Sequence, residues 1–163
     1  MLVPARHPSR KTIRLTEDVY RTVGLPFLIT FNLRRGDAAS EPLGSLLQAT
    51  FARATAAVPC DVFVWCVMPD HVHTVLAPRL GRSVVEWVGA YKSLASTAAR
   101  KLGCALGWQR SFHDRVLQPD NLRDAVLYTL LNPVRAGLVH CWEAWPLHGS
   151  LEWDLSTANW DEA

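Results

Sequence analysis

The sequence predicts an α+β fold in which helices pack on one face of an antiparallel sheet. Two observations indicate this class. Apolar, β-branched runs of strand length alternate with segments whose apolar residues recur at helical spacing. The resulting order is strand, helix, strand, strand, helix, strand, helix. This order is typical of the ferredoxin-like split βαβ arrangement.

The first half of the chain contains three of the expected strands and one helix. Residues 26–34 are β-branched and aromatic, and residues 60–68 and 71–77 are the next strand-like runs. A Pro-Asp pair between the last two indicates a tight antiparallel connection. Residues 43–58 place apolar side chains near helical spacing, so we expect a helix there.

The second half contains helices with recognisable ends. Ser83, with Glu86 three residues later, predicts a capping box at the start of a helix that Gly103 ends. Pro119 fits the first turn of a further helix. The elements expected after Gly103 are a strand at 112–117, a helix at 119–131 and a turn or short helix at 132–139.

Composition suits one globular domain with a sizeable core. The chain has 163 residues, of which 49% are hydrophobic and 20% are charged. No apolar run reaches the roughly 20 residues that span a bilayer, and the first residues lack the apolar stretch of a signal peptide. The four cysteines have no CxxC spacing, so we expect reduced thiols in a cytoplasmic protein that does not contact membranes.

Charge is distributed unevenly along the chain, although the net charge is only +2. Residues 1–35 contain seven Arg and Lys residues and two acidic residues, whereas residues 140–163 contain five acidic residues and no Arg or Lys. The asymmetry fits a polyanionic partner, and it fits a solvated arm and tail equally well. We expect a basic arm at 1–25, a domain at 26–139 and an acidic tail at 140–163.

Two histidines one residue apart fall in the third expected strand. Because strand side chains alternate faces, His71 and His73 project from the same face. Asp124, Tyr128 and Asn132 are four residues apart and form one polar row on a helix. Two imidazoles and an amide oxygen are compatible with a divalent ion that also binds phosphate, and a phenol can act as a nucleophile.

Each of these side chains also has an ordinary structural interpretation. A His-x-His pair alone is often not a metal site, and Tyr128 alone fits a helix surface. Asn132 before Pro133 fits a helix N-cap followed by proline at the first position. Taken separately, the residues leave both interpretations open.

Four strings, taken together, resemble a known family. "VMPDHVHTVL", "YKS", "GWQRSFHDRVL" and "YTLLNPVRAGLV" are similar in order and spacing to the motifs of the single-tyrosine HUH transposases, most closely the REP-associated tyrosine transposases. The resemblance covers residues 26–139. It implies the ferredoxin-like fold and a divalent metal, Mg²⁺ or Mn²⁺, bound by His71 and His73. It also implies Tyr128 as the nucleophile and Asn132, where many insertion-sequence relatives have Gln, as the third ligand.

The resemblance further implies cleavage and rejoining of single-stranded DNA at palindromic hairpin repeats, through a 5′-phosphotyrosine intermediate. No nucleotide cofactor is expected, and the chain contains no GxxxxGK[ST] phosphate loop. Insertion-sequence relatives are homodimers that exchange the tyrosine helix, whereas REP-associated relatives are regarded as monomers, so both states remain open.

DNA contacts are expected from cationic side chains and from aromatic rings that stack on unpaired bases. The candidates are Arg6, Arg10, Lys11, Arg34, Arg35, Lys92, Trp108, Arg110, His113, Arg115 and Arg135. Lys92 is equally a solvated helix residue and Trp108 equally a cap on the sheet. Arg135 has a second interpretation, as the partner of Asp124.

Three other functions remain open from the sequence. An autonomous insertion-sequence transposase would share the chemistry and differ in genomic context. A DNA-binding protein without cleavage is disfavoured by the intact histidines and tyrosine, and a small zinc hydrolase would need a further His, Asp or Glu ligand. The acidic tail either competes with DNA for a basic surface or packs on the domain through Trp142, Trp145 and Trp153.

Overall fold

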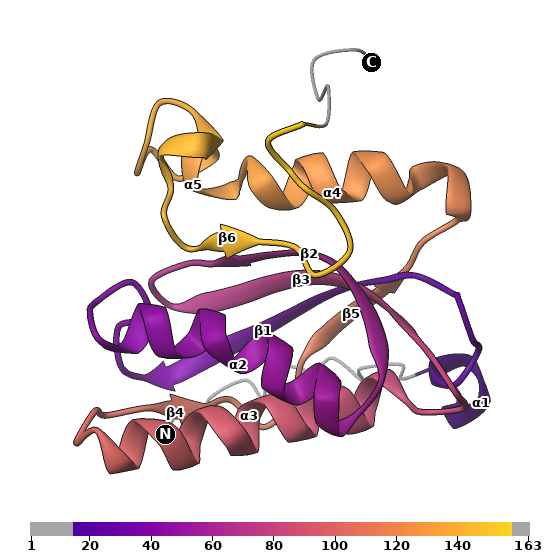
Figure 1. Cartoon of the computed structure of the whole chain (residues 1–163), viewed down its shortest axis with the longest axis horizontal. Coiled ribbons are helices and arrows are strands. Elements are labelled where there is room, and N and C mark those ends of the chain that lie inside the picture. Colours follow the sequence, from indigo (N-terminus) through magenta and orange to yellow (C-terminus); the bar gives the residue numbers. More distant parts are fainter. Residues whose placement is uncertain (1–14, 158–163) are drawn as a thin grey trace, which may run out of the picture.

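The protein is built around one antiparallel sheet between two layers of helices (Figure 1). The computed structural model describes residues 15–157. The four longer strands lie side by side in the order β5-β1-β3-β2, which is the order of a ferredoxin-like sheet, and so the predicted α+β class is confirmed. These strands are β1 (Phe27–Arg35), β2 (Cys60–Val67), β3 (His71–Pro78) and β5 (His113–Val116).

Two short strands extend this sheet at its edges. The two-residue strands are β4 (Gly107–Trp108), which pairs with the end of β1, and β6 (His148–Gly149), which pairs with β2. Neither has a period-two pattern in the sequence, because two residues are too few to show one.

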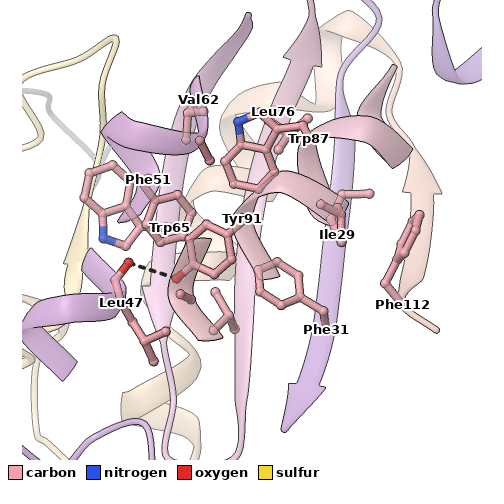
Figure 2. Close-up of a cluster of buried hydrophobic side chains, with 14 of the residues drawn as sticks. Ile29, Phe31, Leu47, Phe51, Val62, Trp65, Leu76, Trp87, Tyr91 and Phe112 are labelled. Carbon is pink, nitrogen blue, oxygen red and sulfur yellow. Dashed lines mark hydrogen bonds between the residues drawn. The ribbon is translucent and has the colours of Figure 1, made fainter. Parts of the chain in front are cut away.

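Helices α2 (Leu43–Ala57) and α3 (Val84–Lys101) cover one face of the sheet. The alternate side chains of β1 that point to them, from Phe27 to Leu33, are buried. Figure 2 shows the aromatic part of this core, where the Phe51 and Trp65 rings stack with centroids 4.5 Å apart. The predicted capping box of α3 is present, since the Ser83 side chain accepts from the backbone while Glu86 bonds back to Ser83.

Helix α4 (Leu122–Leu130) lies on the opposite face, so the prediction that all helices pack on one face was wrong. Val126 and Leu130 of α4 are buried against Val64 and Val75 of the sheet. Seven of the eight residues of β3 are buried, as expected for a strand covered on both sides. The consecutive apolar residues 75–77 of β3 fit a strand that is covered by helices on both faces.

The third expected helix, at 119–131, is divided into two pieces, and the short helix expected within 132–139 is present. A 3₁₀ turn (Pro119–Asn121) precedes α4, and a short helix α5 (Asn132–Arg135) follows it. Pro119 therefore begins the 3₁₀ turn rather than the helix itself.

Segments on both sides of residues 26–139 contribute to the packed core. Tyr20, in α1 (Glu17–Tyr20), is buried and donates to the carboxylate of Asp114. After a 3₁₀ turn (Trp142–Ala144), the Trp145 indole donates to the carbonyl of Val67, and Trp153 packs against Phe63. Residues 142–153 thus pack on the domain through their tryptophans, as one of the two interpretations of the tail predicted.

All four cysteines lie within the described residues and carry free thiols. Across residues 15–157, no helix is long and apolar enough to cross a bilayer.

Candidate active site

The register of the sheet collects the candidate side chains on the face covered by α4. Thr30 of β1 is paired with His73 of β3 on one side and with His113 of β5 on the other. Leu28 is likewise paired with Arg115. Residues paired directly across antiparallel strands project to the same face, so these side chains share the face on which His71 also lies.

The two predicted metal-ligating histidines meet through their Nε2 atoms, which are 3.0 Å apart. The Nδ1 atom of His71 lies 2.6 Å from Oδ1 of Asp70, and Nδ1 of His73 lies 2.8 Å from the hydroxyl of Thr30. Because a carboxylate only accepts, the His71 ring donates from Nδ1 to Asp70. The Thr30 hydroxyl can accept from His73 in the same way, and in that tautomer each Nε2 atom carries a lone pair.

This geometry fits a bound divalent cation. Two ligands about 2.1 Å from one ion and at right angles to each other are roughly 3 Å apart, as the two Nε2 atoms are. Burial, and then the neighbouring charges of His71 and Arg135, lower the pKa of His73 to about 4. His73 is therefore neutral near pH 7, and the neutral imidazole is the form that binds metals.

Tyr128 is the exposed one of the three tyrosines. Tyr20 and Tyr91 are 2% and 0% exposed, whereas Tyr128 is 44% exposed. Its ring meets that of His73 edge to face, with centroids 6.4 Å apart. Helix α4 thus brings the accessible phenol of the chain to the histidine pair.

Arg135 packs directly on Tyr128. The guanidinium carbon lies 4.3 Å from the centroid of the phenol ring, and Nη1 donates to the backbone carbonyl of Tyr128 at 3.1 Å. The alternative pairing with Asp124 was wrong, because the turn from α4 into α5 brings Arg135 back over the tyrosine. A cation at this position can stabilise negative charge on the phenol oxygen or on a bound phosphate.

Asn132 links α4 to α5. Its amide nitrogen donates to the carbonyls of Tyr128 and Thr129, at 3.0 and 3.2 Å. The N-cap interpretation was wrong, because Leu131 precedes α5 in helical conformation and the two helices run together without an extended residue. With Nδ2 engaged by the backbone, Oδ1 is the atom of Asn132 that can bind a metal.

A groove of about 420 Å³ opens beside Tyr128, between α4 and strands β1 and β5. It is lined by Leu28, Arg115, Leu117, Asn121, Asp124, Ala125 and Tyr128. Sequence reasoning placed Arg115 and Tyr128 at the site but missed Asn121, and it missed Thr30 and Asp70 beside the histidines. The partnership of Thr30 with His73 depends on strand register, which no local pattern of the sequence carries.

Lys92 and Trp108 have structural roles on the α3 side of the sheet. The Lys92 ammonium donates to the carbonyls of Gln109 and Ser111, and the Trp108 indole donates to the carbonyl of Lys92. The Trp108 ring also packs on Phe31 within the core, at a centroid distance of 5.4 Å. These contacts fix the segment that contains β4 to α3.

The remaining DNA-contact candidates fall into two groups. Arg34, Arg35, Arg110, His113 and Arg115 are exposed, while Arg6, Arg10 and Lys11 lie outside the described residues.

Within residues 15–157, no group of three or more His, Cys, Asp and Glu side chains is placed to hold a metal. Of the expected ligands, His71 and His73 lie together. Asn132 is the first residue of α5, the helix that places Arg135 over the Tyr128 ring.

Comparison with known proteins relates this arrangement to solved structures. A REP-associated tyrosine transposase, solved with a bound REP hairpin, superimposes with a TM-score of 0.67 and 22% identity, over 79% of this chain and 78% of that chain. The chain has the fold of a REP-associated tyrosine transposase. That protein belongs to the family whose motifs the sequence resembles.

A second solved structure agrees with the first. It is a protein of Deinococcus radiodurans with a provisional assignment as a transposase, and it matches with a TM-score of 0.50 and 14% identity, over 64% of this chain and 87% of that chain. No family model and no curated protein matches the sequence.

Proposed function

We propose that the protein is a single-tyrosine HUH transposase of the REP-associated type, which cuts and rejoins single-stranded DNA beside palindromic hairpins. One observation carries the proposal: the exposed phenol of Tyr128 lies against His73, whose Nε2 atom converges with that of His71. The shared fold supports it, because the transposase with that fold was solved with a DNA hairpin bound.

In the proposed reaction, the phenol oxygen of Tyr128 attacks the scissile phosphorus and loses its proton. A P–O bond to Tyr128 forms, the P–O3′ bond breaks, and the departing 3′ oxygen takes up a proton. The products are a 5′-phosphotyrosine and a free 3′-hydroxyl. A 3′-hydroxyl can attack the phosphotyrosine in the reverse sense and join two strands, so no nucleotide cofactor is needed.

The surrounding side chains would support this chemistry. His71, His73 and Oδ1 of Asn132 would hold Mg²⁺ or Mn²⁺, which when bound supplies a Lewis acid for the scissile phosphate. Asp70 and Thr30 orient the two imidazoles.

Arg135 packs over the Tyr128 ring, and its positive charge would stabilise negative charge that develops on the phenol oxygen.

The test is formation of a covalent protein–DNA adduct with single-stranded hairpins from the repeats that flank the gene. With Mg²⁺ or Mn²⁺, the wild-type chain should give a species that migrates as protein plus DNA on a denaturing gel. Tyr128→Phe removes one hydroxyl, so it should abolish the adduct and leave hairpin binding nearly unchanged. Hairpin binding without an adduct by the wild type would instead indicate a DNA-binding protein that does not cleave.

The metal is tested in the same assay. EDTA should abolish the adduct, and Mg²⁺ or Mn²⁺ should restore it. Activity that returns only with Zn²⁺, without an adduct, would favour the zinc hydrolase. An autonomous insertion-sequence transposase would give the same adduct and would be recognised by element ends, rather than scattered palindromic repeats, around its gene.

A further inference from the structure

We propose that the groove beside Tyr128 binds one unpaired nucleobase next to the scissile phosphate and selects a base with an exocyclic amino group. This inference rests on the proposed function, because it assigns part of the DNA substrate to the same face of the sheet. The groove is large enough for a base, with a volume of about 420 Å³.

The floor of the groove is apolar. Leu117 and Ala125 are 3% and 7% exposed, and Leu28 reaches the same groove from the adjoining β1. A groove that only tracked a phosphate backbone would be expected to be lined by cations. Apolar side chains instead suit the flat face of a base that has left the stack.

The rim contains a carboxylate, which is the more specific observation. Asp124 is exposed and makes no ion pair with any residue between 15 and 157. A carboxylate repels a phosphate at close range, but it accepts hydrogen bonds from the amino groups of adenine, cytosine and guanine. Thymine has no exocyclic amino group, so the groove should reject it.

Two further side chains complete the rim. Asn121 precedes Asp124 by three residues and can both donate to and accept from a base edge. Arg115 faces them from β5, where its guanidinium can bind the phosphate of the same nucleotide or stack on the base.

The placement relative to the nucleophile defines which nucleotide is bound. Asp124 lies one helical turn before Tyr128, a rise of about 6 Å along α4. A base seated against Asp124 therefore belongs to a nucleotide that flanks the cleaved bond. Asp124 would be a specificity-determining residue rather than a catalytic one.

The experiment measures hairpin binding by the Tyr128→Phe variant, in which turnover cannot distort the affinity. Each base within three positions of the cut is replaced by thymine, and separately by the analogue that lacks only its amino group, such as inosine for guanine. One position should lose about tenfold in affinity with either replacement. Equal affinity for all the replaced strands would overturn the proposal, even where the wild type cleaves normally.

Protein variants provide a second measurement. Asp124→Asn keeps the shape of the side chain and adds a donor, so the variant should lose discrimination against thymine at that position. Asp120→Asn makes the same charge change outside the groove and should keep the discrimination. A uniform gain in affinity for every strand with both variants would show that Asp124 acts through charge alone, and would contradict base selection. Absence of any adduct with wild-type protein would count against the proposed function instead.

Discussion

The two histidines of the candidate site are held by partners in very different surroundings. Asp70, which binds His71, is 83% exposed at the turn between β2 and β3, whereas Thr30 holds His73 from within the sheet. A mobile ligand ring samples many orientations, so a fixed Nδ1 contact improves metal affinity. The part-buried Thr30–His73 contact should be the more important of the two, because water competes with it less than with the exposed contact of Asp70.

Thr30→Val tests this contact, since valine keeps the shape of threonine but loses the hydroxyl. We expect the variant to fold and to require about 10- to 100-fold more Mn²⁺ for half-maximal adduct formation. Thr22→Val is the matched control, because Thr22 is exposed and its hydroxyl donates to the backbone carbonyl of Asp18, away from the histidines. If Thr30→Val needs the same Mn²⁺ concentration as the wild type, even when the variant is less stable, Thr30 contributes only to packing.

Between helices α4 and α5, the side chain of Asn132 has two roles, one structural and one proposed in metal binding. Its amide nitrogen holds the carbonyls at the end of α4, and its Oδ1 is the proposed metal ligand. Substitutions can separate the two, because aspartate retains the oxygen ligand but has no donor for the backbone carbonyls.

Asn132→Asp should therefore form the adduct while unfolding more easily, by about 1 to 3 kcal/mol, because a carboxylate now faces the two carbonyls. Asn132→Ala should be destabilised as well and should form no adduct at temperatures where it is folded. Thermal melting and adduct formation are measured on the same samples. A folded Asn132→Ala variant that cleaves as the wild type does would show that Asn132 only joins the helices.

The pairing of β6 with β2 depends on a glycine. A Cβ on Gly149 would lie 2.8 Å from Cε2 and Cη2 of Trp65 and closer still to Cζ2, and the indole cannot retreat because it stacks on Phe51. Gly89, inside α3, has nothing within 4 Å of an added Cβ.

The two glycines should respond to alanine with opposite signs. Gly149→Ala should lower the free energy of unfolding by about 1 to 3 kcal/mol through overpacking. Gly89→Ala should raise it by up to about 1 kcal/mol through helix propensity. Chemical denaturation of both variants checks this, and equal effects would mean that β6 is not packed on Trp65 as described.

The sequence predicted the elements that carry strong local signals. The capping box of Ser83 and Glu86 located the start of α3, and the side chains of β1 that alternate from Phe27 to Leu33 marked a strand with one buried face. It did not predict which face α4 covers, because Val126 and Leu130 would be equally apolar against either. The role of Thr30 and the groove at Asn121 depend on strand register and on tertiary contacts, which leave no local pattern.

At the scale of the whole molecule, the two faces of the sheet differ in character. The face covered by α2 and α3 holds the larger aromatic core, which gives the sheet a rigid support (Figure 2). The face covered by α4 holds a smaller apolar cluster beside the histidines, the exposed tyrosine and the groove. Reactive groups on a rigid sheet can be held to the narrow tolerances that phosphoryl transfer requires.

The proposed role of Tyr128 is tested most sharply by locating the DNA attachment by mass spectrometry after trypsin and nuclease digestion of the adduct. Tyr128 is the single tyrosine of the tryptic peptide Asp124–Arg135. We expect a nucleotide phosphate on Tyr128 in this peptide, formed only with a divalent metal and absent from Tyr128→Phe. Attachment to Tyr20 or Tyr91, or an adduct that persists in Tyr128→Phe, would contradict it.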